Sequence, residues 1–181
     1  MTTELTRPDL DLLGPELDGV APATFKAVFR RHPAGVAVIT FAGPERLGGF
    51  TATSVISVSA DPPLLTFSVD SASSSWAALR EVDTLVVNFL AADQVEVSTR
   101  FATSGIDRFA AGGWTVLPSG EPVLDGSPAW FRGQVVQRTP VGRSFLVSVL
   151  ALDSALAADA ERAPLVYHDR SYHAVGDHSA L

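Results

Sequence analysis

Residues 48–76 read GGFTATSVISVSADPPLLTFSVDSASSSW, a stretch that holds two strand-like segments, a turn and a cluster of serines. Phe50–Ser59 and Leu64–Val69 are rich in β-branched and aromatic residues, which predicts two strands. The run Asp61-Pro62-Pro63 between them is typical of a tight turn. The stretch therefore predicts two strands that follow one another closely, with a serine-rich segment after them.

Hydroxyl side chains crowd the first of these strands. They belong to Thr51, Thr53, Ser54, Ser57 and Ser59. A strand that enters a barrel core would bury some of them, and buried hydroxyls need hydrogen-bond partners, which a polar ligand would supply. Threonine also suits strands and serine suits helix caps, so ligand binding and an ordinary structural role both stay open here.

The serines at 73–75 stand where a helix is expected to begin. Ser74–Glu81 predicts a short helix that buries Trp76 and Leu79. The unpaired amides and the positive dipole end at the start of such a helix favour a phosphate group. This segment is a second candidate for ligand contact.

Short β-rich runs continue along the rest of the chain. Turns such as Gly43-Pro44, Gly112-Gly113 and Asp125-Gly126 separate them. Strands with tight connections, and no regular alternation with long helices, predict a mainly β fold: a closed antiparallel barrel with peripheral helices. The remaining predicted strands are Val36–Phe41, Thr84–Leu90, Trp114–Leu117, Ala129–Arg138, Arg143–Leu152 and Leu165–Tyr167.

Two more helices are predicted beside the strands. Thr24–Arg31 carries Phe25, Val28 and Phe29 on one face. Asp93–Thr103 begins with Asp93 as a plausible N-cap. We expect a flexible extension at 1–22, one domain over 23–176 and a short tail at 177–181.

Composition excludes several classes of function. The 181 residues carry 20 acids against 13 bases, a formal charge of −7, and no Lys/Arg run, which argues against nucleic-acid binding. There is no cysteine, so redox chemistry would need a bound cofactor. Scattered acids at the start of the chain are the reverse of a secretory signal, and no apolar stretch has membrane-spanning length. These features predict a cytoplasmic protein without a membrane partner.

The common nucleotide and metal motifs are missing from the sequence. No G-x-G-x-x-G follows a predicted strand, and residues 43–49 lack the Lys and Ser/Thr of a P-loop. The histidines, His32, His168, His173 and His178, show no metal-like spacing on a predicted helix, so no metal site is expected.

Several runs taken together resemble the flavin reductase-like, FMN-binding split-barrel family. In order, they are HPAGVAVIT, GFTATSVISVSADPPLLTFSV, SSSW, VVNFLAADQVEVSTRFA, DRFA, GEPVLDGSPAWFRGQV and PLVYHDRSYHAVG, which extend over most of 25–176. The resemblance implies an antiparallel, Greek-key-like split β-barrel. It also implies an NAD(P)H-dependent reductase of FMN or FAD that uses NADH or NADPH as electron donor. It further implies a homodimer that supplies reduced flavin to a partner monooxygenase or another acceptor.

The resemblance also implies roles for particular residues. Thr51, Ala52, Thr53 and Ser54 are expected along the isoalloxazine and ribityl chain, and Ser68, Ser74 and Ser75 near the phosphate end. Arg108, and less directly Arg100, are the candidates for the basic residue at the flavin phosphate, because a guanidinium can grip a phosphate through two hydrogen bonds. An ordinary solvated helix face is the alternative for Arg100.

One position departs from the family pattern. Relatives often carry Gly-Asp-His before the penultimate strand, where the histidine lies by the nicotinamide, whereas this chain has Gly142-Arg143-Ser144. Arg143 is then a candidate contact for a nucleotide phosphate, and Ser144 for the carboxamide.

Three functions remain open on the sequence alone. Hydride transfer to a flavin needs ring stacking rather than an acid, base or nucleophile, so no catalytic side chain is predicted. The favoured function is a flavin reductase. The alternatives are a flavoprotein with tightly bound flavin that reduces another substrate, and a flavin-binding module without turnover.

Overall fold

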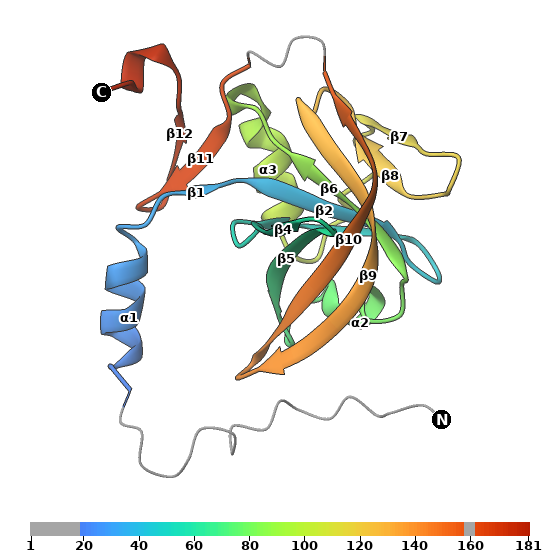
Figure 1. Ribbon diagram of the computed structural model, residues 1–181, viewed down its shortest axis with the longest axis horizontal. Coiled ribbons are helices and arrows are strands. Elements are labelled where there is room, and N and C mark those ends of the chain that lie inside the picture. The colour runs from blue at the N-terminus through green and yellow to red at the C-terminus, as the bar shows by residue number, and fades with distance from the viewer. Residues whose placement is uncertain (1–18, 158–161) are drawn as a thin grey trace.

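The computed structural model describes residues 19–157 and 162–181, in which strands dominate (Figure 1). Residues 1–18, most of the predicted extension, lie outside the described residues. The helices are α1 (Pro22–Phe29), α2 (Trp76–Leu79) and α3 (Val95–Ala102), with short 3-10 helices η2 (Ala92–Gln94) and η3 (Asp177–Ser179). The strands are β1 (Ala34–Gly35), β2 (Ala37–Ala42), β3 (Leu47–Ala52), β4 (Ile56–Ala60), β5 (Pro63–Asp70), β6 (Thr84–Phe89), β7 (Trp114–Val116), β8 (Pro122–Leu124), β9 (Ala129–Val141), β10 (Ser144–Leu156), β11 (Leu165–His168) and β12 (Ser171–Ala174).

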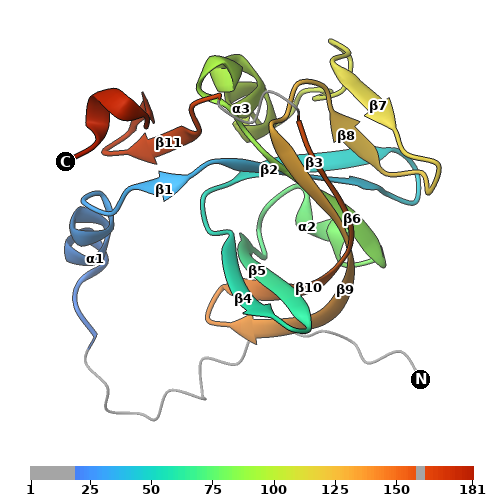
Figure 2. The ribbon, with the colours of Figure 1, turned by 45° about the horizontal axis from the view of Figure 1, so that its top comes forward.

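A seven-stranded sheet forms the body of the molecule. Its strand order is β3-β2-β6-β9-β10-β5-β4, and each neighbouring pair is antiparallel. Figure 2 shows the sheet curling, with β2 and β3 on one side and β4 and β5 on the other. A three-stranded sheet, β1-β11-β12, and the β7-β8 hairpin flank it. The prediction of a mainly β, antiparallel barrel with peripheral helices is confirmed.

The barrel is split between its two edge strands. β3 and β4 end the strand order, although they follow one another in the chain, and among the described strands no ladder joins β3 to β5 across the gap. The barrel is therefore not closed by hydrogen bonds as expected. The split leaves main-chain groups of β3 and β5 without a strand partner, and such groups can bind a ligand.

Alternating side chains on β2 pack into two cores. Ala37, Ile39 and Phe41 point into the barrel, where they meet Phe67 of β5, while Val36 and Val38 lie on the opposite face. The second face is covered by α3 through Phe101 and by Leu90, Phe109, Leu124 and Leu165. β2 is buried on both faces because the barrel lies on one side of it and α3 on the other.

The strand predicted over Phe50–Ser59 is wrong, because the chain makes two strands there. β3 ends at Ala52 and β4 begins at Ile56, so 53–55 cross from one edge of the sheet to the other. Ser54 takes the place of a strand partner for β5: its Oγ accepts the Ser68 N–H at 3.0 Å and donates to the Ser68 carbonyl at 3.2 Å. A period-two pattern with hydroxyls on both sides does not reveal this crossing.

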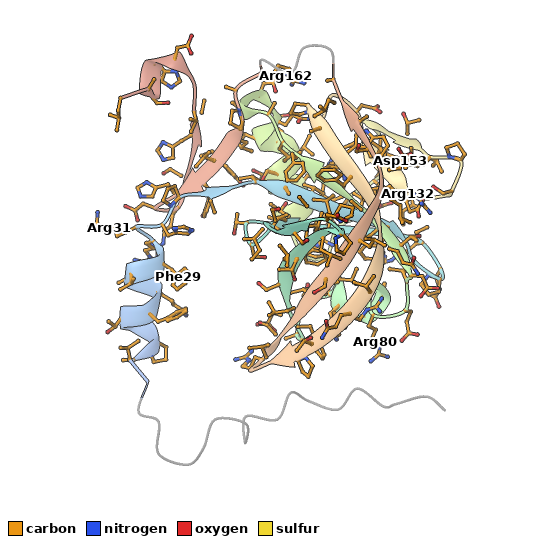
Figure 3. All side chains as sticks on the ribbon, viewed as in Figure 1. Phe29, Arg31, Arg80, Arg132, Asp153 and Arg162 are labelled. Atoms are coloured by element: carbon orange, nitrogen blue, oxygen red, sulfur yellow. The ribbon has the colours of Figure 1, made fainter. Side chains whose placement is uncertain are left out.

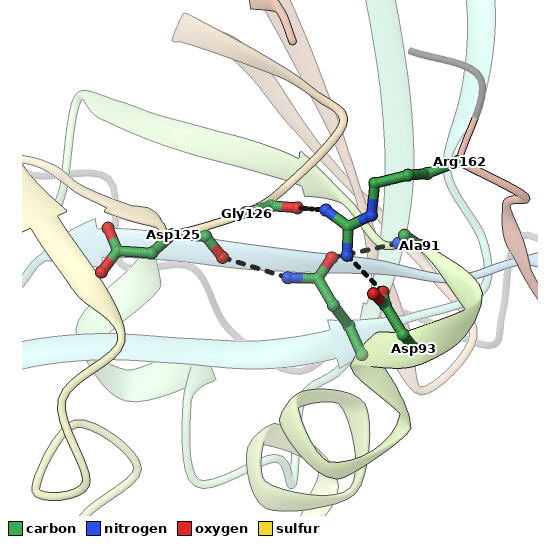
Figure 4. Close-up of polar contacts among 6 residues, drawn as sticks. Ala91, Asp93, Asp125, Gly126 and Arg162 are labelled. Atoms are coloured by element: carbon green, nitrogen blue, oxygen red, sulfur yellow. Dashed lines mark hydrogen bonds and ion pairs between the residues drawn. The ribbon is translucent and has the colours of Figure 1, made fainter. Parts of the chain in front are cut away.

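The predicted helices differ from the observed ones at their ends. α2 has four residues instead of the eight predicted over 74–81, and a helix this short does not provide a phosphate-binding N-terminus. In the third helix Asp93 is not the cap: the Gln94 Oε1 accepts the Ala91 N–H at 3.0 Å. The Asp93 carboxylate instead forms an ion pair with Arg162, and Arg162 also donates to the Gly126 carbonyl (Figure 4). The strands β1, β8 and β12 were not predicted at all.

Candidate functional site

The first cleft of the site lies at the split of the barrel. It has a volume of about 460 Å³, and we call it the hydroxyl cleft. β3 and the crossing after it supply one wall, and the end of β5 with the serine turn supplies the other. Its lining includes Phe50, Thr51, Ala52, Thr53, Ser54, Ser68, Val69, Asp70, Ala72, Ser73, Ser74, Phe101, Ala102, Ser104 and Arg108. Seven of the nine predicted cofactor residues line this cleft, all except Ser75 and Arg100.

Two of the predicted hydroxyls already have protein partners. Thr51 Oγ1 donates to the Ser98 carbonyl at 2.6 Å, and Ser54 Oγ is bonded to the main chain of Ser68 at both its N–H and its C=O. These hydroxyls hold α3 to β3 and the crossing to β5. These two hydroxyls therefore do not require a ligand as a hydrogen-bond partner. They contribute to the cleft by holding its walls in place.

The main chain at the end of β3 also turns toward the hydroxyl cleft. The Gly49 carbonyl accepts from Arg108 and Ser75, so the main chain of Gly49 faces away from β2. N–H and C=O groups of alternate residues in an antiparallel strand turn to the same side, which directs the main chain of Thr51 toward the cleft. The hydroxyl side chains of Thr53, Ser68 and Ser74 line the same cleft.

A second cleft continues from the first past Ser74 and Arg108, which line both. It has a volume of about 300 Å³, and we call it the arginine cleft. Its lining includes Phe41, Arg46, Leu47, Gly48, Gly49, Ser74, Ser75, Ala78, Gly105, Ile106, Asp107, Arg108 and Phe109. Gly48 must lack a side chain, because a Cβ there would lie 2.3 Å from the Phe41 ring, so the cleft floor is bare main chain.

Arg108 is held in place at the junction of the two clefts. Its Nη1 donates to the Gly49 carbonyl at 3.0 Å and to Ser75 Oγ at 3.2 Å, and its Nε donates to the Thr103 carbonyl at 3.1 Å. Ser75 Oγ also donates to the Gly49 carbonyl at 3.3 Å. The guanidinium is thereby oriented by neutral oxygens, which leave its positive charge uncompensated and its Nη2 available for an anion.

Two positive charges converge on the arginine cleft. Burial lowers the pKa of the Arg108 guanidinium from its ordinary value, and repulsion from Arg46 lowers it further. Among the described residues neither arginine forms an ion pair, and the Asp107 Oδ1 accepts the Phe109 N–H at 3.0 Å. An anion with two charges, such as a phosphate group, would relieve this repulsion and can take bidentate hydrogen bonds from a guanidinium.

Arg46 was missed by the sequence interpretation. It follows Gly43-Pro44 in the turn between β2 and β3, and the hairpin brings it back beside α2 and Arg108. A basic residue in a short turn looks like a solvated surface residue. Its proximity to Arg108, 62 positions further along the chain, depends on the fold.

Arg100 lines neither cleft. Its Nη2 donates to the Gly112 carbonyl at 3.4 Å, and its guanidinium carbon lies 5.6 Å from the centre of the Phe101 ring. These contacts tie α3 to the loop before β7. Arg100 is therefore half-buried and not the solvated helix face of the alternative, and its phosphate contact stays a prediction.

Arg143 and Ser144 lie at the rim of the hydroxyl cleft. Ser144 is paired with Asp70 in the β5–β10 ladder, and the Ser71 N–H donates to the Arg143 carbonyl at 3.0 Å. Asp70 lines the hydroxyl cleft but not the arginine cleft. The two residues predicted to contact the nicotinamide nucleotide therefore lie next to the hydroxyl cleft, although neither lines a cleft, and they are separate from Arg46 and Arg108.

Comparison with known proteins agrees with this architecture. Residues 29–176 match the model of the flavin reductase like domain. The chain belongs to this family. A curated relative in the family, the NADH:FMN oxidoreductase of Rhodococcus qingshengii, is 42% identical over 174 residues, which are 93% of this chain and 91% of the relative. The FMN reductase (NADH) RutF of Variovorax paradoxus is 37% identical and covers 87% of this chain and 89% of its own length.

Solved structures of the flavin reductase family have the same fold. The flavin reductase domain protein from Arthrobacter sp. FB24 is 36% identical, with a TM-score of 0.81 over 86% of this chain and 96% of its own. BorF, the flavin reductase component of a bacterial two-component tryptophan halogenase, is 28% identical, with a TM-score of 0.79 over 87% of this chain and 99% of its own. The predicted family and split-barrel fold are confirmed. No helix in the described part of the chain has the length and apolar character required to span a membrane.

Proposed function

We propose that the protein is an NAD(P)H:flavin oxidoreductase that binds FMN or FAD at the split of its barrel. The observation that carries the proposal is the pair of connected clefts, one rich in hydroxyls and free main-chain groups and the other holding Arg46 and Arg108. The parts of a flavin nucleotide follow the same order as the two clefts: a planar ring, then a polyhydroxyl chain, then a phosphate. Membership of the flavin reductase family and the NADH:FMN oxidoreductase relative support the same function.

Each wall of the site has a separate task in this proposal. Thr53, Ser68 and the main chain of Thr51 bind the ring edge and ribityl hydroxyls, and Arg108 binds the phosphate. When bound, the flavin supplies the hydride acceptor, so no acid, base or nucleophile of the chain is required. The residues accelerate the reaction by orienting the two rings and by excluding water.

Arg143 and Ser144 are proposed to bind the nicotinamide nucleotide. They lie beside Asp70 at the rim of the hydroxyl cleft, where a nicotinamide can stack on a ring held in that cleft. The Ser144 hydroxyl can form a hydrogen bond with the nicotinamide carboxamide, but it offers a smaller contact surface than the histidine that relatives often carry at this position. We therefore propose nicotinamide use with weakened ground-state binding.

Anaerobic stopped-flow mixing tests the activity. FMN or FAD bound to the protein should be reduced by NADH or NADPH, and so lose its visible absorbance, faster than free flavin under the same conditions. Ser144→His should lower the KM for the nucleotide with a smaller change in kcat, because an added ground-state contact acts on KM first. If neither nucleotide at millimolar concentration bleaches bound flavin faster than free flavin, the reductase function fails. A tightly bound flavoprotein with another substrate, or a non-catalytic module, would then take its place.

The acceptor of the reduced flavin is proposed to be a partner enzyme, a flavin-dependent monooxygenase or a related oxygenating enzyme. BorF is the reductase component of a two-component halogenase, which gives a precedent for such a partner. The arrangement requires that the reduced flavin leave the site. Both clefts of the site are accessible at the surface, so release does not require the barrel to open.

We further propose that the protein is a homodimer. Helix α1 stands away from the barrel in both views and has no buried residue (Figures 1 and 2). Phe25 and Phe29 have ring centres 4.6 Å apart and are 53% and 57% exposed, and Figure 3 shows Phe29 away from the side chains of the barrel. Ile56 and Val58 of edge strand β4 are also exposed. Exposed apolar side chains grouped in this way are typical of a protein–protein interface, and a second copy of the chain would cover them.

Light scattering should give a particle of twice the 19.1 kDa chain mass at micromolar concentration. Changing both Phe25 and Phe29 to Ser should shift it toward the monomer, because the helix loses its apolar face. Val116→Ser is the matched control, since Val116 is a 49% exposed apolar residue on β7, far from α1 in sequence and in Figure 1. A wild-type protein that scatters as a single chain rules out the dimer.

A further inference from the structure

A third hollow adjoins the arginine cleft on the other side of Arg46. It has a volume of about 330 Å³, and we call it the α2 groove; it is lined by Pro44, Glu45, Arg46, Ser74, Ala77 and Ala78. Arg46, Ser74 and Ala78 also line the arginine cleft, whereas the hydroxyl cleft shares Ser74 with the groove. The arginine cleft is therefore the middle of three connected hollows.

We propose that the α2 groove binds the ADP half of FAD, so that the site takes FAD more tightly than FMN. The proposal rests on the proposed flavin reductase function, because it assigns the hydroxyl cleft to the ring. FMN ends at its phosphate and would leave the groove without a ligand. FAD continues through a second phosphate to a ribose and an adenine.

The positions of the two arginines match a diphosphate. Arg108, held by the Gly49 carbonyl and Ser75 Oγ, lines both the hydroxyl cleft and the arginine cleft, while Arg46 lines both the arginine cleft and the α2 groove. A diphosphate carries its charges on two adjacent phosphorus atoms. Arg108 is placed for the phosphate next to the ribityl chain, and Arg46 for the phosphate next to the adenosine.

The groove walls suit an adenine ring. Pro44, Ala77 and Ala78 are small and apolar, which leaves room for a flat ring between the hairpin turn and α2. The Glu45 carboxylate is the acidic group of the groove and can accept a hydrogen bond from the adenine amino group. The turn itself is closed by the Gly43 N–H, which donates to the Arg46 carbonyl at 3.0 Å, so the wall is formed before a ligand binds.

The nicotinamide donor also contains an ADP unit, but its place in the site is different. Its nicotinamide must stack on the flavin ring, and the residues proposed for it, Arg143 and Ser144, lie beside Asp70 at the rim of the hydroxyl cleft. The α2 groove lies beyond the flavin phosphate instead. A groove in line with the phosphate end continues the flavin and not the donor.

Calorimetric titration of the full chain with riboflavin, FMN and FAD tests the proposal. We expect FAD to bind about tenfold more tightly than FMN, and Arg46→Gln to weaken FAD by about tenfold and FMN by about twofold, since a charge-assisted contact is lost. ADP should displace FAD but leave riboflavin bound. Arg80→Gln is the matched control, because Arg80 is an exposed arginine just after α2 that lines none of the three hollows and should leave both affinities unchanged.

Several results would overturn the proposal. Equal affinities of the wild type for FMN and FAD mean that the groove adds nothing to flavin binding. Equal losses of both flavins in Arg46→Gln place Arg46 at the first phosphate. An NADH KM that rises in Arg46→Gln with FMN as acceptor, while FAD affinity stays the same, assigns the groove to the donor. If no flavin binds at all, the proposed function fails as well, whereas FMN binding without a preference for FAD removes this inference alone.

Discussion

Replacement of Arg108 by Ala should weaken FMN binding by about 1.5–3 kcal/mol, the range for hydrogen bonds to charged groups, while riboflavin affinity changes little. The reason lies in how the side chain is held. Gly49, Ser75 and Thr103 orient the guanidinium with neutral oxygens, so its charge is free to serve a phosphate. Riboflavin has no phosphate and therefore reports only on the ring and ribityl contacts. Fluorescence quenching or calorimetry with both ligands measures the difference.

The Arg108 experiment has a matched control in Arg100→Ala. Arg100 lies in the same part of the chain and also donates to a backbone carbonyl, but it lines neither cleft. Its loss should leave the affinities for FMN and riboflavin near those of the wild type. Because Arg108→Ala also removes a donor from the Gly49 carbonyl, thermal unfolding of each variant must be followed. Equal losses of FMN and riboflavin in Arg108→Ala would mean that the residue acts through the fold and not through the phosphate.

The sequence was sufficient for the parts of the fold that depend on local patterns. β5, β6 and β9 follow the predicted segments closely. In β5 the apolar side chains of Leu65, Phe67 and Val69 alternate with less buried residues and meet one core, as the pattern predicts. The family resemblance supplied the architecture, which strand patterns alone gave only as a mainly β barrel. It also gathered Thr51–Ser54, Ser68 and Ser74 at one cleft, where the structure brings them together.

The features that the sequence did not predict all depend on contacts between distant segments. The strand over Phe50–Ser59 breaks because Ser54 pairs with the main chain of Ser68. Asp93 leaves the cap position for Arg162, which is brought near by the C-terminal return of the chain. Arg46 joins the site through a hairpin turn, and nothing in the local sequence indicates that Phe25 and Phe29 of α1 stay exposed in the single chain. The partner residues in these contacts are distant in the sequence, so a local sequence pattern does not reveal them.

Substitution of Glu121 is the second change expected to have a large effect, here on the stability of the fold and not on ligand binding. Glu121 precedes β8, and its side chain is 2% exposed. Both of its carboxylate oxygens accept from Arg132 Nε of β9 at 3.1 Å. Burial alone would raise the pKa of Glu121, but hydrogen bonding, chiefly from Arg132, outweighs it and lowers the pKa to about 2. The ion pair therefore fastens the β7-β8 hairpin to the barrel.

A carboxyl group with a lowered pKa stabilises the folded state most where it is ionised in both states. In the unfolded chain Glu121 should titrate near its ordinary pKa of about 4.3, so the stabilisation is fully present above that pH and is lost as the pH falls toward about 2. A difference of this size corresponds to about 3 kcal/mol of unfolding free energy. We expect Glu121→Gln to lose about that amount at pH 6, because the amide cannot replace the charge beside Arg132.

Urea unfolding at pH 6 and at pH 3, followed by tryptophan fluorescence, measures both parts of the Glu121 prediction. The wild type should lose more stability than Glu121→Gln between the two pH values, because the variant has no carboxylate to protonate at this position. Asp93→Asn is the matched control: its ion pair with Arg162 lies at the surface, with Asp93 67% exposed, and should contribute less than about 1 kcal/mol. If Glu121→Gln is as stable as the wild type at pH 6 and has the same pH dependence, Glu121 does not stabilise the barrel through its charge. The β7-β8 hairpin would then be held by its other contacts, the hydrogen bonds that join Pro122 to Thr40 and Leu124 to Asn88 and the apolar packing of Leu124.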